Sequence, residues 1–261
     1  MTSTLPVVCC PVDRRYVAST GRVAAVFSLV VLTVFPPDTP AADRQVYFAL
    51  DGGVQTGDFG TPVRNNLYSV SPTLGMVAHK YDLSVTLPYQ FLQQSSAGQS
   101  TTESGLGDIV LQAGYVLVVD RTDGMSLNAS VAVKLPTADE TKGLGTGKTD
   151  IGASFSLGQR LGPVRLSLLG GYIKVGDPAG QNYNDVTLYG AGVAGTQGGT
   201  RLYASLEGRR ALIAGADNPL EFYVGFFHLF GQRMAIRGTA FTGLNDGGPA
   251  YGVSLGFVKF L

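Results

Sequence analysis

The segment from Lys142 to Thr149, KGLGTGKT, ends in the Gly-Lys-Thr sequence that closes a phosphate-binding loop. In such a loop the glycines allow backbone N–H groups to surround the phosphates, and the helix that follows directs its N-terminus at them. Here Lys142 occupies the position of the first required glycine, and a strand-like pattern follows Thr149. The pattern therefore does not predict nucleotide binding, and we expect a flexible, glycine-rich external loop instead.

Histidine and cysteine, which serve in many metal sites and as catalytic nucleophiles or bases, are scarce in this chain. The two histidines are His79 and His228, and both cysteines, Cys9 and Cys10, lie in an N-terminal segment that we expect to be removed. Lipid hydrolases built on barrels present a His and a Ser two residues apart on one outer strand face, but both residues two positions from His228 are phenylalanines. We therefore expect no catalytic residue, no metal site and no cofactor, and a lipid hydrolase is the less favoured alternative.

Polar and charged side chains occupy alternate positions of segments whose other positions are apolar, so we expect them on the inner wall of a closed sheet. These lumen-lining candidates are Asp82, Gln90, Gln112, Asn128, Lys134, Arg160, Arg165, Arg201, Tyr203, Glu207, Arg209, Glu221, Tyr223, Arg233 and Arg237. Such a wall could filter solutes by charge, and it could equally be a self-neutralising network that fills the interior. A hairpin centred near Gly215 would set Arg209 across from Glu221 as an ion pair.

The segments that position these residues have a period of two. From Tyr81 to Phe91, alternate residues are Tyr, Leu, Val, Leu, Tyr and Phe, and those between them are Asp, Ser, Thr, Pro and Gln. Successive strand side chains point to opposite faces, so the segment has one apolar and one polar wall. About twelve such segments start near Gln45, Leu67, Tyr81, Leu106, Met125, Asp150, Val164, Asp185, Arg201, Leu220, Arg233 and Ala250. Their lengths suit a tilted membrane strand of about 9–11 residues.

The connections between these segments alternate in length. The short ones are residues 79–80, 120–124, 162–163, 197–200 and 231–232. The longer ones are residues 56–66, 92–105, 136–149, 176–184, 211–219 and 244–249. A bacterial outer-membrane barrel has an even number of antiparallel strands, short periplasmic turns and longer extracellular loops. We therefore predict an all-β chain that forms an antiparallel transmembrane β-barrel of about twelve strands, with both termini in the periplasm.

The composition agrees with a wall that faces lipid. Charged residues make up 15% of the chain, against roughly 25% in an ordinary soluble domain. Lys+Arg and Asp+Glu number 19 each, so we expect no broad basic surface for nucleic acid. A secreted soluble β-sandwich would also alternate its side chains, but its water-facing side would carry more charge than the Ser, Thr, Gly, Gln and Asn found here.

The N-terminus has the pattern of a secretory signal. Three arginines precede an unbroken apolar run from Val23 to Phe35, and the small residues Ala41 and Ala42 follow it. A basic segment, a short apolar run and small residues at the cleavage site are typical of a signal peptide. The apolar run is shorter than the about 20 residues that a transmembrane helix needs. We expect residues 1–42 to be a cleaved signal peptide and residues 43–261 to form a barrel in the bacterial outer membrane.

Two stretches of the chain resemble a known family. They are SGLGDIVL at residues 104–111 and VKLPTADETKGLGTGKTDIG at residues 133–152. The Gly-Asp before a strand and the Lys-Leu-Pro-Thr entry to a loop resemble recurring features of the outer-membrane transporter family labelled "MetA-pathway of phenol degradation". The resemblance implies an outer-membrane channel, associated in some members with the breakdown of aromatic compounds, and it implies no catalytic residue.

These features together predict a channel for passive uptake of small solutes, with aromatic or hydrophobic compounds as the class that fits. Tyr203, Tyr223 and Phe227 share the inward parity and would offer a stacking surface. Twelve strands lie between the filled eight-stranded barrel and the open sixteen-stranded porin, so a narrow pore is expected. The segment from Leu92 to Gly105 could fold inward and close it, and a plugged barrel with a structural or adhesive role is the alternative.

The expected partners follow from this location. They are outer-membrane lipids, a small-molecule solute and the barrel-insertion machinery, which reads an aromatic residue near the C-terminus, here Phe260. No nucleic acid is expected, and the sequence does not predict an oligomeric state.

Overall fold

The computed structural model describes residues 44–59, 63–96, 98–120, 123–178 and 180–261. The signal peptide expected at residues 1–42 lies outside these residues. Apart from one short 3₁₀ helix, η1 (Glu140–Lys142), the elements of the described chain are strands. Within the same residues, none of the helices has the length and apolar character required to cross a membrane.

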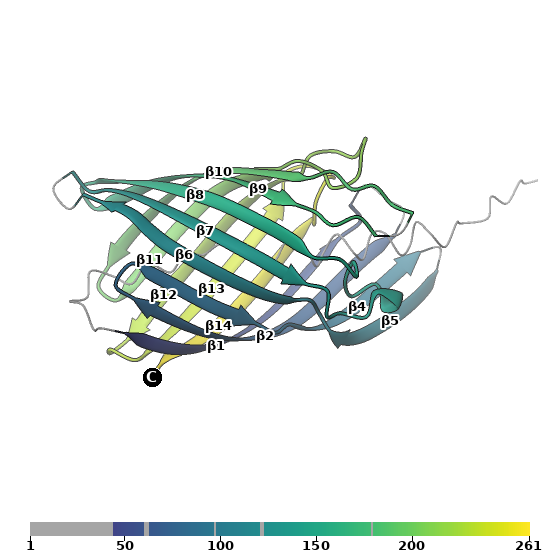
Figure 1. Cartoon of the computed structure of the whole chain (residues 1–261), viewed down its shortest axis with the longest axis horizontal. Helices are drawn as coiled ribbons and strands as arrows, with labels where there is room; N and C mark the ends of the chain where they lie inside the picture. The colour runs from purple at the N-terminus through teal and green to yellow at the C-terminus, as the bar shows by residue number, and fades with distance from the viewer. Residues whose placement is uncertain (1–43, 60–62, 97, 121–122, 179) are drawn as a thin grey trace, which may run out of the picture.

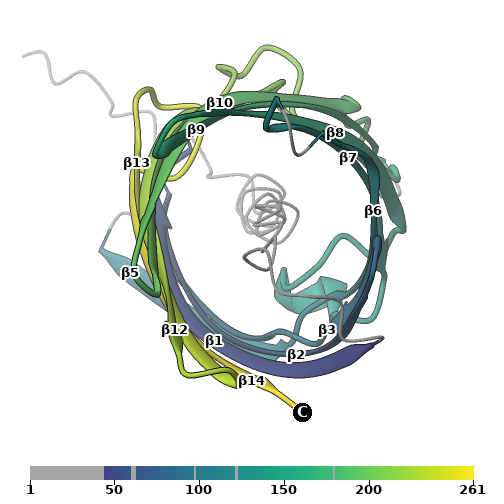
Figure 2. The ribbon, with the colours of Figure 1, turned by 90° about the vertical axis from the view of Figure 1, so that its left-hand side faces the viewer.

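The strands form one antiparallel sheet that closes on itself. They are β1 (Gln45–Gly57), β2 (Arg64–Ala78), β3 (Tyr81–Thr86), β4 (Tyr89–Ser96), β5 (Gln99–Leu106), β6 (Ile109–Val119), β7 (Met125–Leu135), β8 (Asp150–Leu161), β9 (Val164–Lys174), β10 (Val186–Gln197), β11 (Thr200–Arg209), β12 (Leu220–Phe230), β13 (Met234–Gly243) and β14 (Tyr251–Phe260). β1 pairs with β2 on one side and with β14 on the other, which closes the barrel (Figure 1). Figure 2 shows the ring of strands end on.

Two pairs of strands each occupy a single position in the wall. β3 and β4 both pair with β2 and are separated by Leu87 and Pro88. Proline has no N–H to donate to the ladder, which explains the break. β5 and β6 are separated by Gly107 and Asp108. The fourteen strands therefore fill twelve positions, which confirms the predicted barrel of about twelve strands.

The two rims of the barrel differ as the sequence predicted. The start of β1 and the end of β14 lie together, because Tyr47 pairs with Phe260. The turns at residues 79–80, 162–163 and 198–199 are at this end, which we call the short-turn rim. The connections at residues 136–149, 175–185, 210–219 and 244–250 are at the other end, the long-loop rim.

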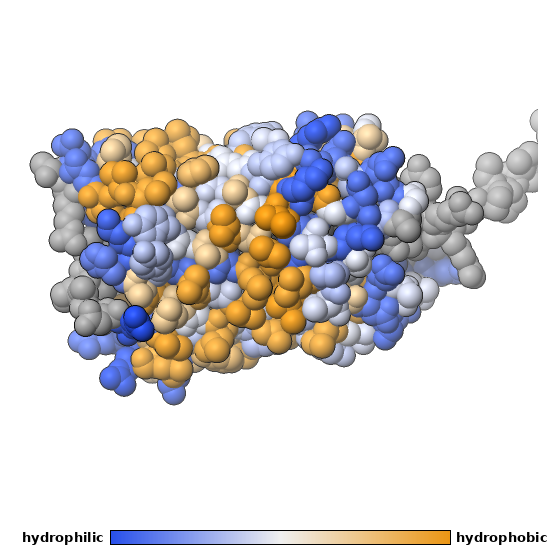
Figure 3. Space-filling model, in the orientation of Figure 1, coloured by the Kyte–Doolittle hydropathy of each residue, from blue (hydrophilic) through white to orange (hydrophobic). Residues whose placement is uncertain are grey.

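The outer wall is apolar. Large hydrophobic side chains that alternate along the strands are strongly exposed, among them Phe155 at 56% and Leu255 at 63%. Figure 3 shows apolar residues over the side of the barrel and hydrophilic residues toward the long-loop rim. Monomeric proteins in water rarely expose apolar patches of this extent, whereas the lipid-facing band of a membrane barrel consists of them.

The predicted connection at residues 92–105 is wrong. β4 continues to Ser96 and β5 starts at Gln99, and their ladder runs from Tyr89 opposite Leu106 to Ser96 opposite Gln99. The alternation of side chains is weak here because most of the residues are polar, so the sequence pattern indicates a loop. Within the described residues β5 pairs with β4 alone, and the hairpin extends the wall at the long-loop rim. It does not fold inward to close the lumen.

The connection that folds inward is instead the one at residues 136–149. Leu144 is 1% exposed and packs against Leu67 of β2 and Leu92 of β4, both on the inner wall. Figure 2 shows η1, which belongs to this connection, inside the ring. Gly143 and Gly147 have φ values of 73° and 66°, a region that favours glycine, and they let the chain turn back sharply. This glycine-rich connection therefore lies at the long-loop rim, as expected of an external loop, but it folds into the lumen.

Aromatic rings on the inner wall lie flat over glycines of the neighbouring strand. A Cβ at Gly225 of β12 would lie 2.3 Å from Cζ of Tyr203. The hydroxyl of Tyr203 shares a hydrogen bond of 2.6 Å with Oγ1 of Thr239, which lies beyond Gly225 on β13. The absence of a side chain at Gly225 is therefore what allows this ring to cross β12.

Replacing Gly225 by valine is expected to reduce the free energy of unfolding by about 1–3 kcal/mol, because the new side chain overlaps the Tyr203 ring. Urea unfolding of the refolded barrel in detergent measures the change. Gly52→Val is the matched control, since a Cβ at Gly52 meets no atom within 4 Å and faces outward from β1. Equal stability of the two variants would contradict the expected packing.

Candidate functional site

The inner wall of the barrel holds most of the predicted lumen-lining residues. Those that alternate with apolar outward-facing neighbours and are partly or fully buried are Asp82, Gln90, Gln112, Asn128, Lys134, Arg165, Arg201, Tyr203, Glu207, Arg209, Glu221, Tyr223 and Arg237. Arg160 and Arg233 are instead exposed, at the end of β8 and just before β13. These two arginines belong to the short-turn rim.

A buried cluster joins the inward-folded connection to the wall. Nζ of Lys134 on β7 lies 2.8 Å from a carboxylate oxygen of Asp150 on β8 and 3.3 Å from one of Asp108. It also donates a hydrogen bond of 2.8 Å to Oγ1 of Thr146, within the connection. We call these four residues the Lys134 cluster, and each of them is at most 4% exposed.

The backbone around the Lys134 cluster is held by the same carboxylates. Asp108 accepts a hydrogen bond of 3.0 Å from the N–H of Ala138, and Asp150 accepts one of 2.9 Å from the N–H of Gly176. Sequence reasoning singled out Lys134 alone. Asp108 and Asp150 belong to the two stretches that carry the family resemblance, so this resemblance was the available signal for the cluster.

The ion pair predicted across the β11–β12 hairpin is present. Nη1 and Nη2 of Arg209 donate to the two carboxylate oxygens of Glu221 over 2.7 and 2.9 Å. The hydroxyl of Tyr223 donates to the same carboxylate over 2.6 Å. Glu207 lies directly opposite Glu221 in the ladder and accepts a hydrogen bond from the hydroxyl of Ser205. Two carboxylates therefore share the neighbourhood of one guanidinium group.

A second bidentate pair spans the seam where the barrel closes. Arg237 of β13 donates from Nε and Nη2 to the carboxylate of Asp51 on β1, over 2.8 and 2.6 Å. The pair crosses β14 at Gly256, where a Cβ would lie 2.0 Å from Asp51 Oδ1. Sequence reasoning missed Asp51, although it shares the inward parity of its strand.

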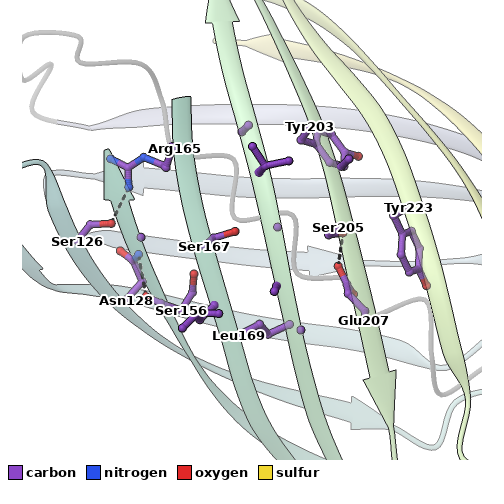
Figure 4. Close-up of a pocket in the computed structure, with 18 of the residues that line it drawn as sticks. Ser126, Asn128, Ser156, Arg165, Ser167, Leu169, Tyr203, Ser205, Glu207 and Tyr223 are labelled. Carbon is purple, nitrogen blue, oxygen red and sulfur yellow. Dashed lines mark hydrogen bonds between the residues drawn. The ribbon is translucent and has the colours of Figure 1, made fainter. Parts of the chain in front are cut away.

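A hollow of about 170 Å³ lies on the inner wall between β7 and β12, and we call it the wall pocket. Its polar lining includes Ser126, Asn128, Arg165 and Arg201, and its apolar lining includes Phe227. Figure 4 shows Arg165 and Tyr203 toward one end of the pocket and Glu207 toward the other. Small inward residues such as serine and glycine leave this space open.

Outside the lumen, His228 and Asp185 each have structural partners. Nδ1 of His228 shares a hydrogen bond of 2.7 Å with Oγ1 of Thr200, and its ring packs on Phe230. At the long-loop rim, hydrogen bonds from Tyr172 and Lys174 lower the pKa of Asp185 to about 2. Within the described residues, no group of three or more His, Cys, Asp or Glu side chains is arranged to hold a metal ion.

Comparison with protein families decides where the chain belongs. The family model described as "Putative MetA-pathway of phenol degradation" matches residues 50–258. The chain belongs to this family. The match spans the barrel from β1 to β14 and includes the Lys134 cluster, the wall pocket and the Asp51–Arg237 pair, and it confirms the resemblance expected from residues 104–111 and 133–152. A search of curated proteins finds none that matches the chain.

Solved structures share the fold of this family member. The COG4313 outer membrane channel from Pseudomonas putida F1 superimposes with a TM-score of 0.70 at 17% identity, over 86% of this chain and 99% of that one. The NanC porin gives a TM-score of 0.53 at 9% identity, over 82% and 99%. The translocator domain of the autotransporter NalP from Neisseria meningitidis gives 0.50 at 16% identity, over 94% and 95%.

Proposed function

We propose that the protein is a channel of the bacterial outer membrane through which small solutes diffuse passively. The observation that carries this proposal is the closed twelve-position barrel with an apolar outer wall and a hollow, polar inner wall. Such a wall pattern satisfies every backbone group inside a bilayer while leaving a polar path through it. Outer-membrane lipids surround the barrel, and residues 1–42 act as the signal peptide that exports it.

Aromatic or hydrophobic compounds are the solute class that the inner wall supports best. Tyr203, Tyr223 and Phe227 line the wall pocket beside serines that offer hydrogen bonds. The description of the family refers to phenol degradation, and the structurally similar protein from Pseudomonas putida F1 is named an outer membrane channel. Transport is therefore the activity that we propose.

Planar-bilayer recording of the refolded barrel tests the channel. Discrete conductance steps are expected, and replacing Ala194 of β10 by tryptophan should lower the conductance because this residue lines the wall pocket. Thr187→Trp on the same strand is the matched control, since Thr187 is exposed on the outward face, does not line the wall pocket and should leave conductance unchanged. Heat-modifiable migration on gels shows that each variant has folded.

The rival function is a barrel whose lumen is plugged and whose role is structural or adhesive. The inward-folded connection at residues 136–149 is the observation that favours it. A folded barrel without conductance steps would support this rival and refute the open channel.

A further inference from the structure

Two arginines of the wall pocket lack a carboxylate partner. Arg165 of β9 lies opposite Ala194 of β10, and Arg201 of β11 lies opposite Thr196 of β10. Within the described residues neither of them forms an ion pair with Asp or Glu, in contrast to Arg209 and Arg237. Both are partly buried on the inner wall, near the short-turn rim.

The two guanidinium groups act on each other as like charges. Arg165 and Arg201 both line the wall pocket, on the two strands that flank β10, and as like charges they repel each other. Nη1 of Arg165 donates a hydrogen bond of 2.7 Å to Oγ of Ser126, which holds this group against the wall. A guanidinium group has five N–H donors, so most donors of this pair are available to a ligand. A pair of partly desolvated cations without a counter-charge is an electrostatic site for an anion.

Aromatic side chains flank the same end of the pocket. Phe227 of β12 lies directly opposite Arg201 in the ladder, and Tyr203 is two residues further along β11 on the same face. Tyr203 is held in place by its hydrogen bond with Thr239. A ligand whose anionic group meets the arginines would therefore place its apolar part against these rings.

We propose that this end of the wall pocket, the arginine site formed by Arg165, Arg201, Phe227 and Tyr203, binds the carboxylate of a small aromatic acid. The carboxylate accepts charge-assisted hydrogen bonds from the guanidinium groups, which match its planar geometry. The ring packs against Phe227 and Tyr203. This assignment rests on the proposed function, because the solute reaches the site through the lumen, and it names the solute class that the channel would select.

Isothermal titration of the refolded barrel in detergent, with benzoate as the probe, tests the arginine site. Benzoate is expected to bind more tightly than acetate, which lacks the ring, and than phenol, which is uncharged at neutral pH. Replacing Arg201 by glutamine should weaken benzoate binding by roughly tenfold or more, the loss expected for hydrogen bonds to a charged group. Arg233→Gln makes the same charge change at the exposed short-turn rim and should leave the binding unchanged.

The outcomes separate the site from the channel. Benzoate binding that is equal in the Arg201→Gln and Arg233→Gln variants would overturn the arginine site, and so would acetate binding as tight as benzoate binding. Conductance steps without benzoate binding would also overturn the site and would leave the channel standing. Benzoate binding by a barrel that shows no conductance would support the site and refute the channel. If Arg201→Gln fails to fold, Arg201→Lys keeps the charge but loses the planar fork, and weaker benzoate binding is again expected.

Discussion

Replacing Lys134 by methionine is expected to lower the free energy of unfolding by about 3–5 kcal/mol, the cost of leaving buried charge without its partner. Lys134 is the cation that lies between the carboxylates of Asp108 and Asp150, and all three side chains are at most 5% exposed. Without it the two carboxylates repel each other in a site that water scarcely reaches. Chemical unfolding of the refolded barrel in detergent, followed by circular dichroism, measures the change.

The same substitution should alter the lumen, because Lys134 also donates to Thr146 in the inward-folded connection. Loss of this anchor is expected to release residues 136–149 from the wall and to increase single-channel conductance. Lys134→Arg keeps the positive charge and should retain most of the stability. An Lys134→Met barrel as stable as the unsubstituted protein would contradict the role given to the Lys134 cluster.

Replacing Arg209 by glutamine should cost a comparable amount, about 3–5 kcal/mol. Glu221 is 1% exposed, and it would lose both hydrogen bonds from the guanidinium group. Glu207 lies directly opposite, so two carboxylates would remain without the cation between them. The same unfolding assay in detergent measures the loss.

A double variant distinguishes a lost charge partner from a general packing defect. Arg209→Met combined with Glu221→Leu removes the pair together, and replacing a whole buried pair by apolar residues costs far less than removing one partner. We therefore expect the double variant to be more stable than Arg209→Gln alone, which is a coupling that a double-mutant cycle detects. A double variant at least as unstable as the single one would show that the ion pair is not the source of the loss.

Local patterns in the sequence predicted the parts of the fold that depend on neighbours along the chain. The period of two predicted which side chains face outward and which face the lumen, because each strand presents one face to an apolar environment. The pair between Arg209 and Glu221 was predictable because both residues lie on the same hairpin, although the observed register sets Glu207 rather than Arg209 directly opposite Glu221. The alternating long and short connections identified the two rims, because connection length is read directly from consecutive segments of the chain.

Features that depend on distant parts of the chain could not be predicted in this way. The pair between Asp51 and Arg237 joins residues 186 positions apart and exists only because β14 carries glycine at position 256. Glycine content suggested an external loop at residues 136–149, but the buried contact of Leu144 with β2 and β4 decides its direction. The glycine content of a segment indicates that its backbone can turn sharply. It does not indicate the direction of the turn, because the residues against which the loop packs lie elsewhere in the sequence.

The position of the Asp51–Arg237 pair has a consequence for how the barrel assembles. β1 and β14 are hydrogen-bonded from Tyr47 opposite Phe260 to Thr56 opposite Tyr251, at opposite ends of the chain. Contacts of such long sequence separation carry the largest loop-closure cost and slow folding. Because the pair bridges β13 and β1, it cannot form until the last hairpin meets the first strand. The Asp51–Arg237 pair is therefore absent until the barrel closes. Such an interaction stabilises the closed barrel chiefly by slowing its unfolding, and it does not speed folding.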